Sequence, residues 1–266
     1  MRQIFFILLA SLLNSAAFAE VPTGSAEPVE ISAAKSLEWN RKEKTYTARE
    51  KVVAVQGAAK IQSDALTARY NDDNGMTDIK TLEADNHVII ESPPYTAYGD
   101  HAVYNVKSGN ATLTGKAMQI TTEADVMTAR DKIEFFGTEN RLLATGNATA
   151  VHGGDTLIAD RLGAYFSKDK AGKLAATKIT ASGNVTIKTP KENITGDEGV
   201  YDIPTQKAVL TGKVRIRQGE NWLEGTRANI DMATGISQLL GSGNAETEGR
   251  VKGMFYPSTV KEKLKD

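Results

Sequence analysis

Few side chains in this sequence could carry out chemistry, and those that could are scattered. The chain of 266 residues has no cysteine, and its three histidines, His87, His101 and His152, lie far apart in the sequence. Without cysteine there is no thiol nucleophile, disulfide, zinc ribbon or iron–sulfur cluster. The histidines show no metal-ligand spacing, so the sequence predicts no metal site.

Recurring aspartates are the remaining candidates for catalytic carboxylates or calcium ligands. The four that recur in phase are Asp64, Asp100, Asp160 and Asp197. A residue that returns in every unit of a repeat is more simply a structural device, and we interpret these as marking turns or strand starts. Sugar cleavage needs a unique pair of carboxylates, which the sequence lacks. We therefore expect no catalytic residue, no cofactor and no enzymatic activity.

The composition is that of a globular protein with balanced charge. The chain is 40% hydrophobic and 24% charged, with 32 basic and 33 acidic residues and a net charge of −1. Binding to a phosphate backbone needs a basic excess that releases counterions. The sequence therefore argues against nucleic acid as a partner.

The first residues predict export. Met1 and Arg2 precede a ten-residue apolar run, Ile4 to Leu13, and Ala17-Phe18-Ala19 is a typical cleavage site. The run is too short for a membrane span, which needs about 20 apolar residues. We expect a signal peptide at residues 1–19, cleaved after Ala19, a flexible lead at 20–30 and a basic, solvated tail at 257–266.

A repeat runs through the rest of the chain. At an offset of 97 residues, Leu113-Thr114-Gly115-Lys116 recurs as Leu210-Thr211-Gly212-Lys213. A shorter period of about 31 residues, marked by an aromatic or large apolar residue and then a glycine-containing signature, divides Ile31 to Arg250 into seven units. The repeat predicts one architecture built from seven similar pieces.

Apolar and polar residues alternate within each unit, which indicates strands. Ile179, Ala181, Gly183, Val185 and Ile187 share one parity. Turn residues separate the strands, so each unit is predicted to form a hairpin. The whole chain is therefore expected to contain about 14–16 antiparallel strands. A glycine in mid-strand marks a bend, and bends at one height would curl the sheet. Its apolar face could then be filled by side chains or form a furrow for apolar cargo.

Several segments resemble the LptA/OstA family of periplasmic lipopolysaccharide-transport proteins. They are Gln62 to Tyr70, Ala102-Val103-Tyr104 with Leu113-Thr114-Gly115, Leu142 to Ala148, Val209 to Val214, and Arg250-Val251 with Pro257 downstream. The resemblance implies an open, twisted antiparallel β-jellyroll over residues 31–256. It also implies that the interior shelters the lipid A acyl chains of lipopolysaccharide and that the protein bridges an inner-membrane transporter and an outer-membrane translocon in the periplasm.

Two sets of residues follow as candidate sites. The lipid-binding groove is predicted to contain Val53, Val55, Ile61, Leu82, Val88, Leu113, Leu142, Ile179, Val185, Leu210 and Val214. An open sheet also has unpaired edges that recruit a strand. We expect recruitment at Ile31 to Val55 and at Gln238 to Val251, with Leu37, Trp39, Leu239 and Val251 contacting LptC-like and LptD-like partners or a head-to-tail copy. The alternative is a secreted repeat β-protein that acts as a structural or adhesin module or binds polysaccharide.

Overall fold

The computed structural model describes residues 28–73, 76–168, 174–242 and 249–257. The predicted signal peptide, most of the lead and nearly all of the basic tail lie outside these residues. The described chain is all-β, as predicted, and contains no helix. Accordingly, nothing in these ranges is a helix with the length and apolarity needed to cross a membrane.

Eighteen strands form one antiparallel sheet. They are β1 (Glu30–Ser32), β2 (Ser36–Asn40), β3 (Thr45–Gln56), β4 (Ala59–Asp73), β5 (Met76–Ser92), β6 (Tyr95–Asn105), β7 (Asn110–Thr114), β8 (Met118–Thr121), β9 (Asp125–Ala129), β10 (Lys132–Phe136), β11 (Arg141–His152), β12 (Asp155–Lys168), β13 (Leu174–Lys188), β14 (Asn193–Asp202), β15 (Lys207–Gln218), β16 (Asn221–Asp231), β17 (Ile236–Leu240) and β18 (Lys252–Met254).

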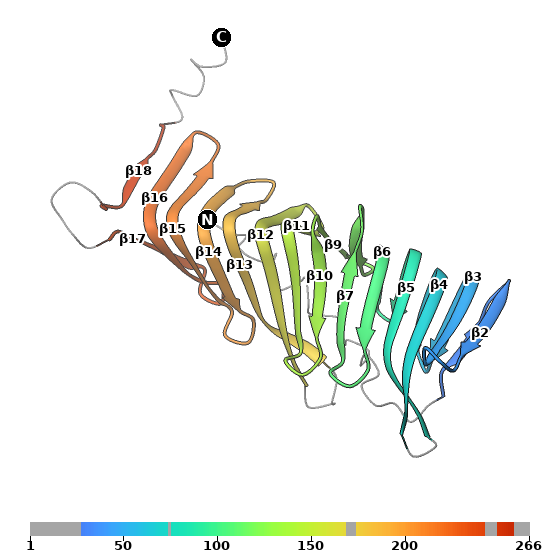
Figure 1. The fold of residues 1–266 in the computed structure, drawn as a ribbon. Coiled ribbons are helices and arrows are strands. Elements are labelled where there is room, and N and C mark those ends of the chain that lie inside the picture. The colour runs from blue at the N-terminus through green and yellow to red at the C-terminus, as the bar shows by residue number, and fades with distance from the viewer. Residues whose placement is uncertain (1–27, 74–75, 169–173, 243–248, 258–266) are drawn as a thin grey trace, which may run out of the picture.

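The strands lie side by side as rows along an elongated sheet (Figure 1). β3 to β6 and β11 to β16 are continuous rows, whereas β1 with β2, β7 with β8, β9 with β10 and β17 with β18 each form a row divided in two. The fourteen rows agree with the predicted strand number, and the division of four rows explains the count of eighteen. The sheet is open, with β1 and β2 at one end and β17 and β18 at the other.

A β-bulge bends most rows near the middle. The pairing register shifts between Thr145 and Ala148, between Ser182 and Val185, and between Thr211 and Val214. Each shift contains a glycine with positive φ, namely Gly146, Gly183 and Gly212. A bulge adds one unpaired residue and bends its strand. The predicted bends at these glycines are confirmed.

The bent sheet encloses one continuous apolar core. Alternate residues of each row contribute to it, because successive side chains on a strand point to opposite faces. Fifteen of the 35 buried apolar residues are alanine. Because these side chains are buried against one another without a ligand, the interior is mostly filled by side chains rather than an open furrow.

The faces of Val53 and Val55 were predicted wrongly. Val52 and Ala54 are buried in the core, whereas Val53 is half-buried and Val55 is 38% exposed. The prediction continued one strand from Val53 through Gly57 to Ile61 with a single alternation, but the chain reverses at Gly57 between β3 and β4. The bend of β3 lies instead at Glu50 and Lys51, which both have positive φ. The alternation of β4 therefore cannot be carried back across this reversal to β3, because a shift of one residue turns every side chain of a strand to the other face.

Candidate functional site

The apolar interior collects most of the residues predicted to line a groove. Seven of them are buried in the core, namely Val88, Leu113, Leu142, Ile179, Val185, Leu210 and Val214. Ile61 is half-buried and packs against the core, and Leu82 is half-buried on the row between β4 and β6. Only Val53 and Val55 belong to the alternate set of residues that faces away from the core. The rows thus bring together, along one surface, residues that are distant in the sequence.

An apolar pocket opens in this interior between β12 and β16. The space there amounts to about 350 Å³ only when the adjoining open solvent is included, so the enclosed part is small. Its wall consists of Leu157, Ile179, Ala181, Val185, Ile187, Gly199, Val200, Tyr201, Ala208, Val209, Leu210 and Ile230. Three predicted groove residues, Ile179, Val185 and Leu210, therefore line this small, partly open pocket.

Tyr201 is the residue of this wall that the sequence did not identify as a site. In the sequence, Tyr201 is only one of the aromatic residues that mark the repeat units. In the structure the residue is fully buried, and its hydroxyl has no hydrogen-bond partner within the described chain. Burial raises the pKa of the Tyr201 hydroxyl, and the neighbouring Asp202 carboxylate adds to this effect. The hydroxyl is thus a neutral donor in an apolar wall.

The first end of the sheet exposes apolar side chains. Leu37 is 61% and Trp39 is 51% exposed on β2. Trp39 stacks on Tyr46 with 5.6 Å between ring centroids, and its indole nitrogen donates a hydrogen bond of 2.7 Å to the Tyr70 hydroxyl. The Arg41 guanidinium lies 4.2 Å from the centre of the Trp39 ring. In the described chain, β2 pairs only with β3, so this aromatic group lies at an open edge.

The opposite end of the sheet, at β17 and β18, also exposes apolar side chains. Ile236 is 64%, Val251 is 43% and Phe255 is 69% exposed, whereas Leu239 is half-buried and packs against the core. β17 and β18 both pair with β16 and with no other described strand. Of the four predicted edge residues, Leu37, Trp39 and Val251 are exposed and Leu239 faces the interior.

The recurring aspartates lie at the bends and not at turns or strand starts, which corrects the prediction from the sequence. Asp100 and Asp160 sit in the middle of β6 and β12. The backbone N–H of Lys116 donates to Asp100 at 2.8 Å, and the Asn184 amide donates to Asp160 at 2.9 Å. Asp100 therefore accepts from a backbone N–H in the gap between β7 and β8, and Asp160 accepts from a side chain in the bulge of β13. This structural role requires no catalytic function.

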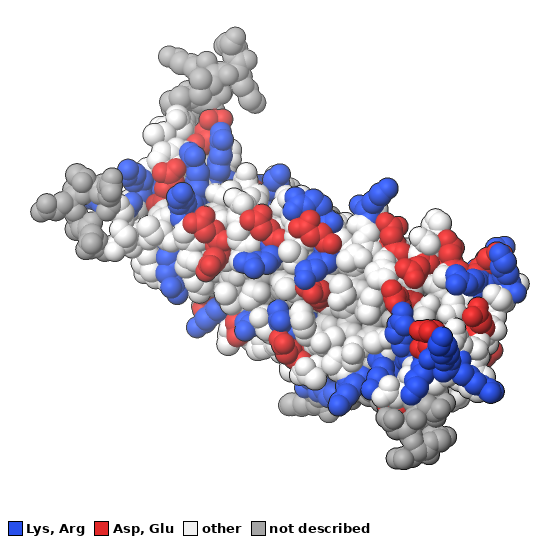
Figure 2. Space-filling view, in the orientation of Figure 1, with Lys and Arg blue, Asp and Glu red and all other residues white. Residues whose placement is uncertain are grey.

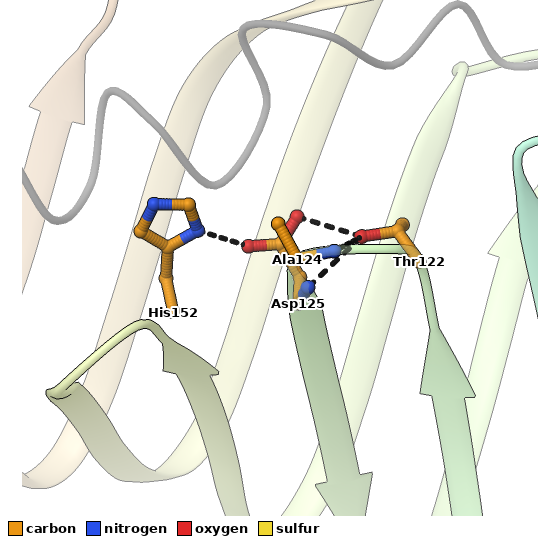
Figure 3. Close-up of polar contacts among 4 residues, drawn as sticks. All are labelled: Thr122, Ala124, Asp125 and His152. Atoms are coloured by element: carbon orange, nitrogen blue, oxygen red, sulfur yellow. Dashed lines mark hydrogen bonds and ion pairs between the residues drawn. The ribbon is translucent and has the colours of Figure 1, made fainter.

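Each of the three histidines contacts an aspartate from another strand through Nδ1. The distances are 2.8 Å for His87 to Asp64, 2.7 Å for His101 to Asp85 and 2.5 Å for His152 to Asp125. Figure 3 shows the last pair, in which Asp125 also accepts a hydrogen bond from the Thr122 hydroxyl. The hydrogen bond and charge of Asp64 raise the pKa of His87. The histidines thus tie neighbouring rows together.

Within the described part of the chain, one group of side chains could hold a cation. Glu83, Asp85 and His101, all partly exposed, place one ligand atom each within 4.8 Å of one another. The sequence did not bring these residues together, because the pairing of β5 with β6 sets Asp85 opposite His101. The hydrogen bond between Asp85 and His101 accounts for the arrangement, and no further feature indicates a bound ion.

Charges of both signs are mixed over the surface. Figure 2 shows acidic and basic side chains interspersed on the visible face. Many form ion pairs, such as Lys60 with Glu91 at 3.2 Å and Arg215 with Glu224 at 3.3 Å. Charges of opposite sign therefore lie close together on this face, without a large field of one sign.

Comparison with known proteins identifies one family. Two overlapping stretches, residues 30–140 and 123–236, match the family described as "LptA/(LptD N-terminal domain) LPS transport protein". Together they include nearly all of the sheet, from β1 to the start of β17.

Two further matches are less close. An uncharacterised protein of Rhizobium meliloti (strain 1021) is 27% identical over 151 residues, which are 55% of this chain and 78% of that protein. The chain also matches the crystal structure of LptH, the LptA homologous periplasmic component of the lipopolysaccharide transport device of Pseudomonas aeruginosa. That match covers 89% of this chain and 100% of the other, with 13% identity and a TM-score of 0.21. The TM-score is too low for this match to carry a structural argument.

Proposed function

The chain belongs to the LptA/LptD N-terminal domain family of lipopolysaccharide-transport proteins, and from this premise we propose that it is a periplasmic carrier for lipopolysaccharide. The acyl chains of lipid A would lie in the apolar interior while the sugars stay in water. The observation that carries the proposal is the continuous apolar core with its pocket between β12 and β16.

The energetics favour a sheltered path. Each methylene that leaves water contributes roughly 0.8 kcal/mol, so a lipid with several acyl chains crosses an aqueous space slowly unless an apolar surface accompanies it. The interior of this sheet supplies apolar residues over its whole length. Many are alanines, and an incoming chain would need the two arms to separate.

The edges support a bridging role. Among the described residues, β2 has no strand beyond β3 and β17 has none beyond β16, so both offer edge N–H and C=O groups beside exposed apolar side chains. A strand from another protein or another copy can pair with such an edge and extend the sheet. We propose that LptC-like and LptD-like components, or a second copy placed head to tail, add to these ends and continue the apolar interior between the two membranes.

Site-specific photocrosslinking tests the carrier function. A crosslinking residue at Ile179 or Leu210 faces the pocket, and we expect it to capture lipopolysaccharide. The matched controls are Val55, which is exposed on the outer face, and Lys213, which is exposed at a bend. Equal capture by both sets, or capture by neither, would refute the proposal.

The alternative of a structural, adhesin or polysaccharide-binding module receives less support. Sugar-binding surfaces favour exposed aromatic platforms beside carboxylates. The exposed Trp39 instead stacks with Tyr46 beside Arg41 at the edge of the sheet.

A further inference from the structure

The row of β1 and β2, at the first end of the sheet, has a counterpart in the middle of the chain, the row of β9 and β10. Each is divided in two and pairs with the strand that follows it, and the pairing is the same: Leu37 lies opposite Ala48, as Ile133 lies opposite Ala144. The β9 and β10 row is covered on its other side by β7 and β8. Ile133 is accordingly 3% exposed, whereas Leu37 is 61% exposed. The covered row therefore shows what a strand added to the β1 and β2 row would meet.

The turns that follow β2 and β10 correspond as well. Lys44 and Asn140 lie at the ends of these turns, and both have positive φ. The carbonyl oxygen of Lys44 accepts a backbone hydrogen bond from β4 at 3.1 Å, and that of Asn140 accepts one from β12 at 2.8 Å. Arg41 and Gly137 are the first residues of the two turns, directly after β2 and β10. Arg41 at the open end thus corresponds to Gly137 at the covered row.

The packing at the covered row leaves room only for glycine at position 137. A Cβ atom there would lie 2.7 Å from the carbonyl oxygens of Ser108 and Gly109, in the turn between β6 and β7. The N–H of Gly137 also donates a hydrogen bond of 3.0 Å to the Asn110 side chain, at the start of β7. At the open end the corresponding residue is Arg41, and its Cβ atom occupies the space that such a turn would need.

A second copy of the chain would bring the same kind of turn to this place. In a head-to-tail joint its β17 would take the position of β7, because each strand is the first part of a divided row. In the turns before these strands, Gly109 and Gly235 both have positive φ. Asn105 and Asp231 each accept, through the side chain, a hydrogen bond of 3.0 Å from the N–H three residues later. The first residue of β17, Ile236, also offers no side-chain acceptor.

The chemistry of Arg41 indicates the kind of strand that fits instead. We infer that Arg41 makes the β1 and β2 edge selective: it opposes a second copy and favours a strand of another protein that has no turn at this level and carries a carboxylate there. The Arg41 guanidinium lies over the Trp39 ring, and within the described ranges no carboxylate pairs with it. A carboxylate can accept two hydrogen bonds from one guanidinium. The inference rests on the proposed bridging function and adds the partner that this edge prefers.

Self-association tests the steric part of the inference. Sedimentation velocity of the full exported chain compares wild type with Arg41→Gly and Arg41→Ala. We expect Arg41→Gly to associate at about tenfold lower concentration, because it removes the Cβ atom that opposes the turn. Arg41→Ala keeps the Cβ atom and should associate as weakly as wild type. Equal association of all three proteins, or an increase in Arg41→Ala as large as in Arg41→Gly, would overturn the steric role.

Peptide binding tests the preference for a carboxylate. The probe is an acetylated, fluorescent peptide with the sequence of residues 110–121, which form β7 and β8 without the preceding turn. We expect its Asn110→Asp form to bind wild type about fivefold more tightly than the unchanged form, as for one charge-assisted hydrogen bond. Fluorescence anisotropy measures both peptides. Arg41→Ala should bind them alike, and Leu37→Lys should weaken both, which places the binding at this edge.

The outcomes separate this inference from the proposed function. If the peptides bind at the edge but Arg41 changes neither the preference for the carboxylate nor self-association, the inference is wrong and the bridging function stands. If neither peptide binds and no variant self-associates, the edge accepts no strand, and the bridging function and the inference are both wrong.

Discussion

Gly183 on β13 leaves the space that the Asp160 carboxylate of β12 occupies. A Cβ atom on Gly183 would collide with Asp160 Oδ2, and Gly183 has a φ of +77°. The next residue, Asn184, donates its side-chain amide to the same carboxylate at 2.9 Å. Gly212 and Asp197 show the same relationship on β15 and β14. The glycine bends and the recurring aspartates are therefore two parts of one device that bends the rows.

We expect Gly183→Ala to destabilise the fold by about 2 kcal/mol or more. A non-glycine residue in the left-handed region costs about 1–2 kcal/mol, and the new methyl group also displaces Asp160. The control is Gly219→Ala, because Gly219 has a φ of +60° but a Cβ there would meet nothing within 4 Å. Urea unfolding measures both variants. Equal losses of unfolding free energy would show that the contact with Asp160 adds nothing.

Glu192 should make stability fall as the pH rises. It precedes β14, and burial raises the pKa of its carboxyl from 4.5 to about 7, against a smaller opposing effect of Lys191. A raised carboxyl pKa contributes stability that is complete below the unfolded value of 4.5 and is lost as the pH rises through about 7.

The Glu192→Gln variant measures this effect. At pH 8 we expect it to be more stable than wild type by about 1 kcal/mol, an amount reduced for the partial exposure of the group. At pH 4 the two proteins should unfold at nearly the same urea concentration. A stability difference that does not vary with pH would contradict the prediction.

The pair of His87 and Asp64 gives a second titration. The hydrogen bond to Asp64 raises the pKa of His87, so Asp64→Asn should lower it. The stability that the pair contributes is present below the ordinary histidine pKa and is lost as the pH rises through the raised value. Proton NMR of the imidazole measures the change, with the His152 signals as an internal control. An unchanged His87 titration in the variant would mean that Asp64 does not set it.

Association through the sheet edge should depend on Leu37. We expect Leu37→Lys to weaken concentration-dependent self-association, because a charge on an exposed edge opposes the addition of another strand. Val126→Lys is the control: Val126 is 38% exposed, but its strand β9 is paired with β8 and with β11. Sedimentation velocity over a range of concentrations measures both variants. Similar association of the two would exclude the β2 edge as the contact.

Much of the architecture was predictable because it follows from local patterns. The alternation of apolar and polar residues with a period of two indicates strands, and the fourteen observed rows lie within the predicted range. The mid-strand glycines Gly146, Gly183 and Gly212 were expected to bend the sheet and do so. Seven of the eleven residues predicted to line the interior are buried there.

The sequence by itself therefore determined the strands, their bends and most of the apolar face, because each is encoded by residues close together in the chain. Only the tertiary structure decided the face of Val55. The chain reverses at Gly57, and this reversal changes which alternate residues of β3 face the core. It also placed Asp160 against Gly183 and Tyr201 in the pocket wall. These relationships depend on the register between strands, and register is a property of the assembled sheet.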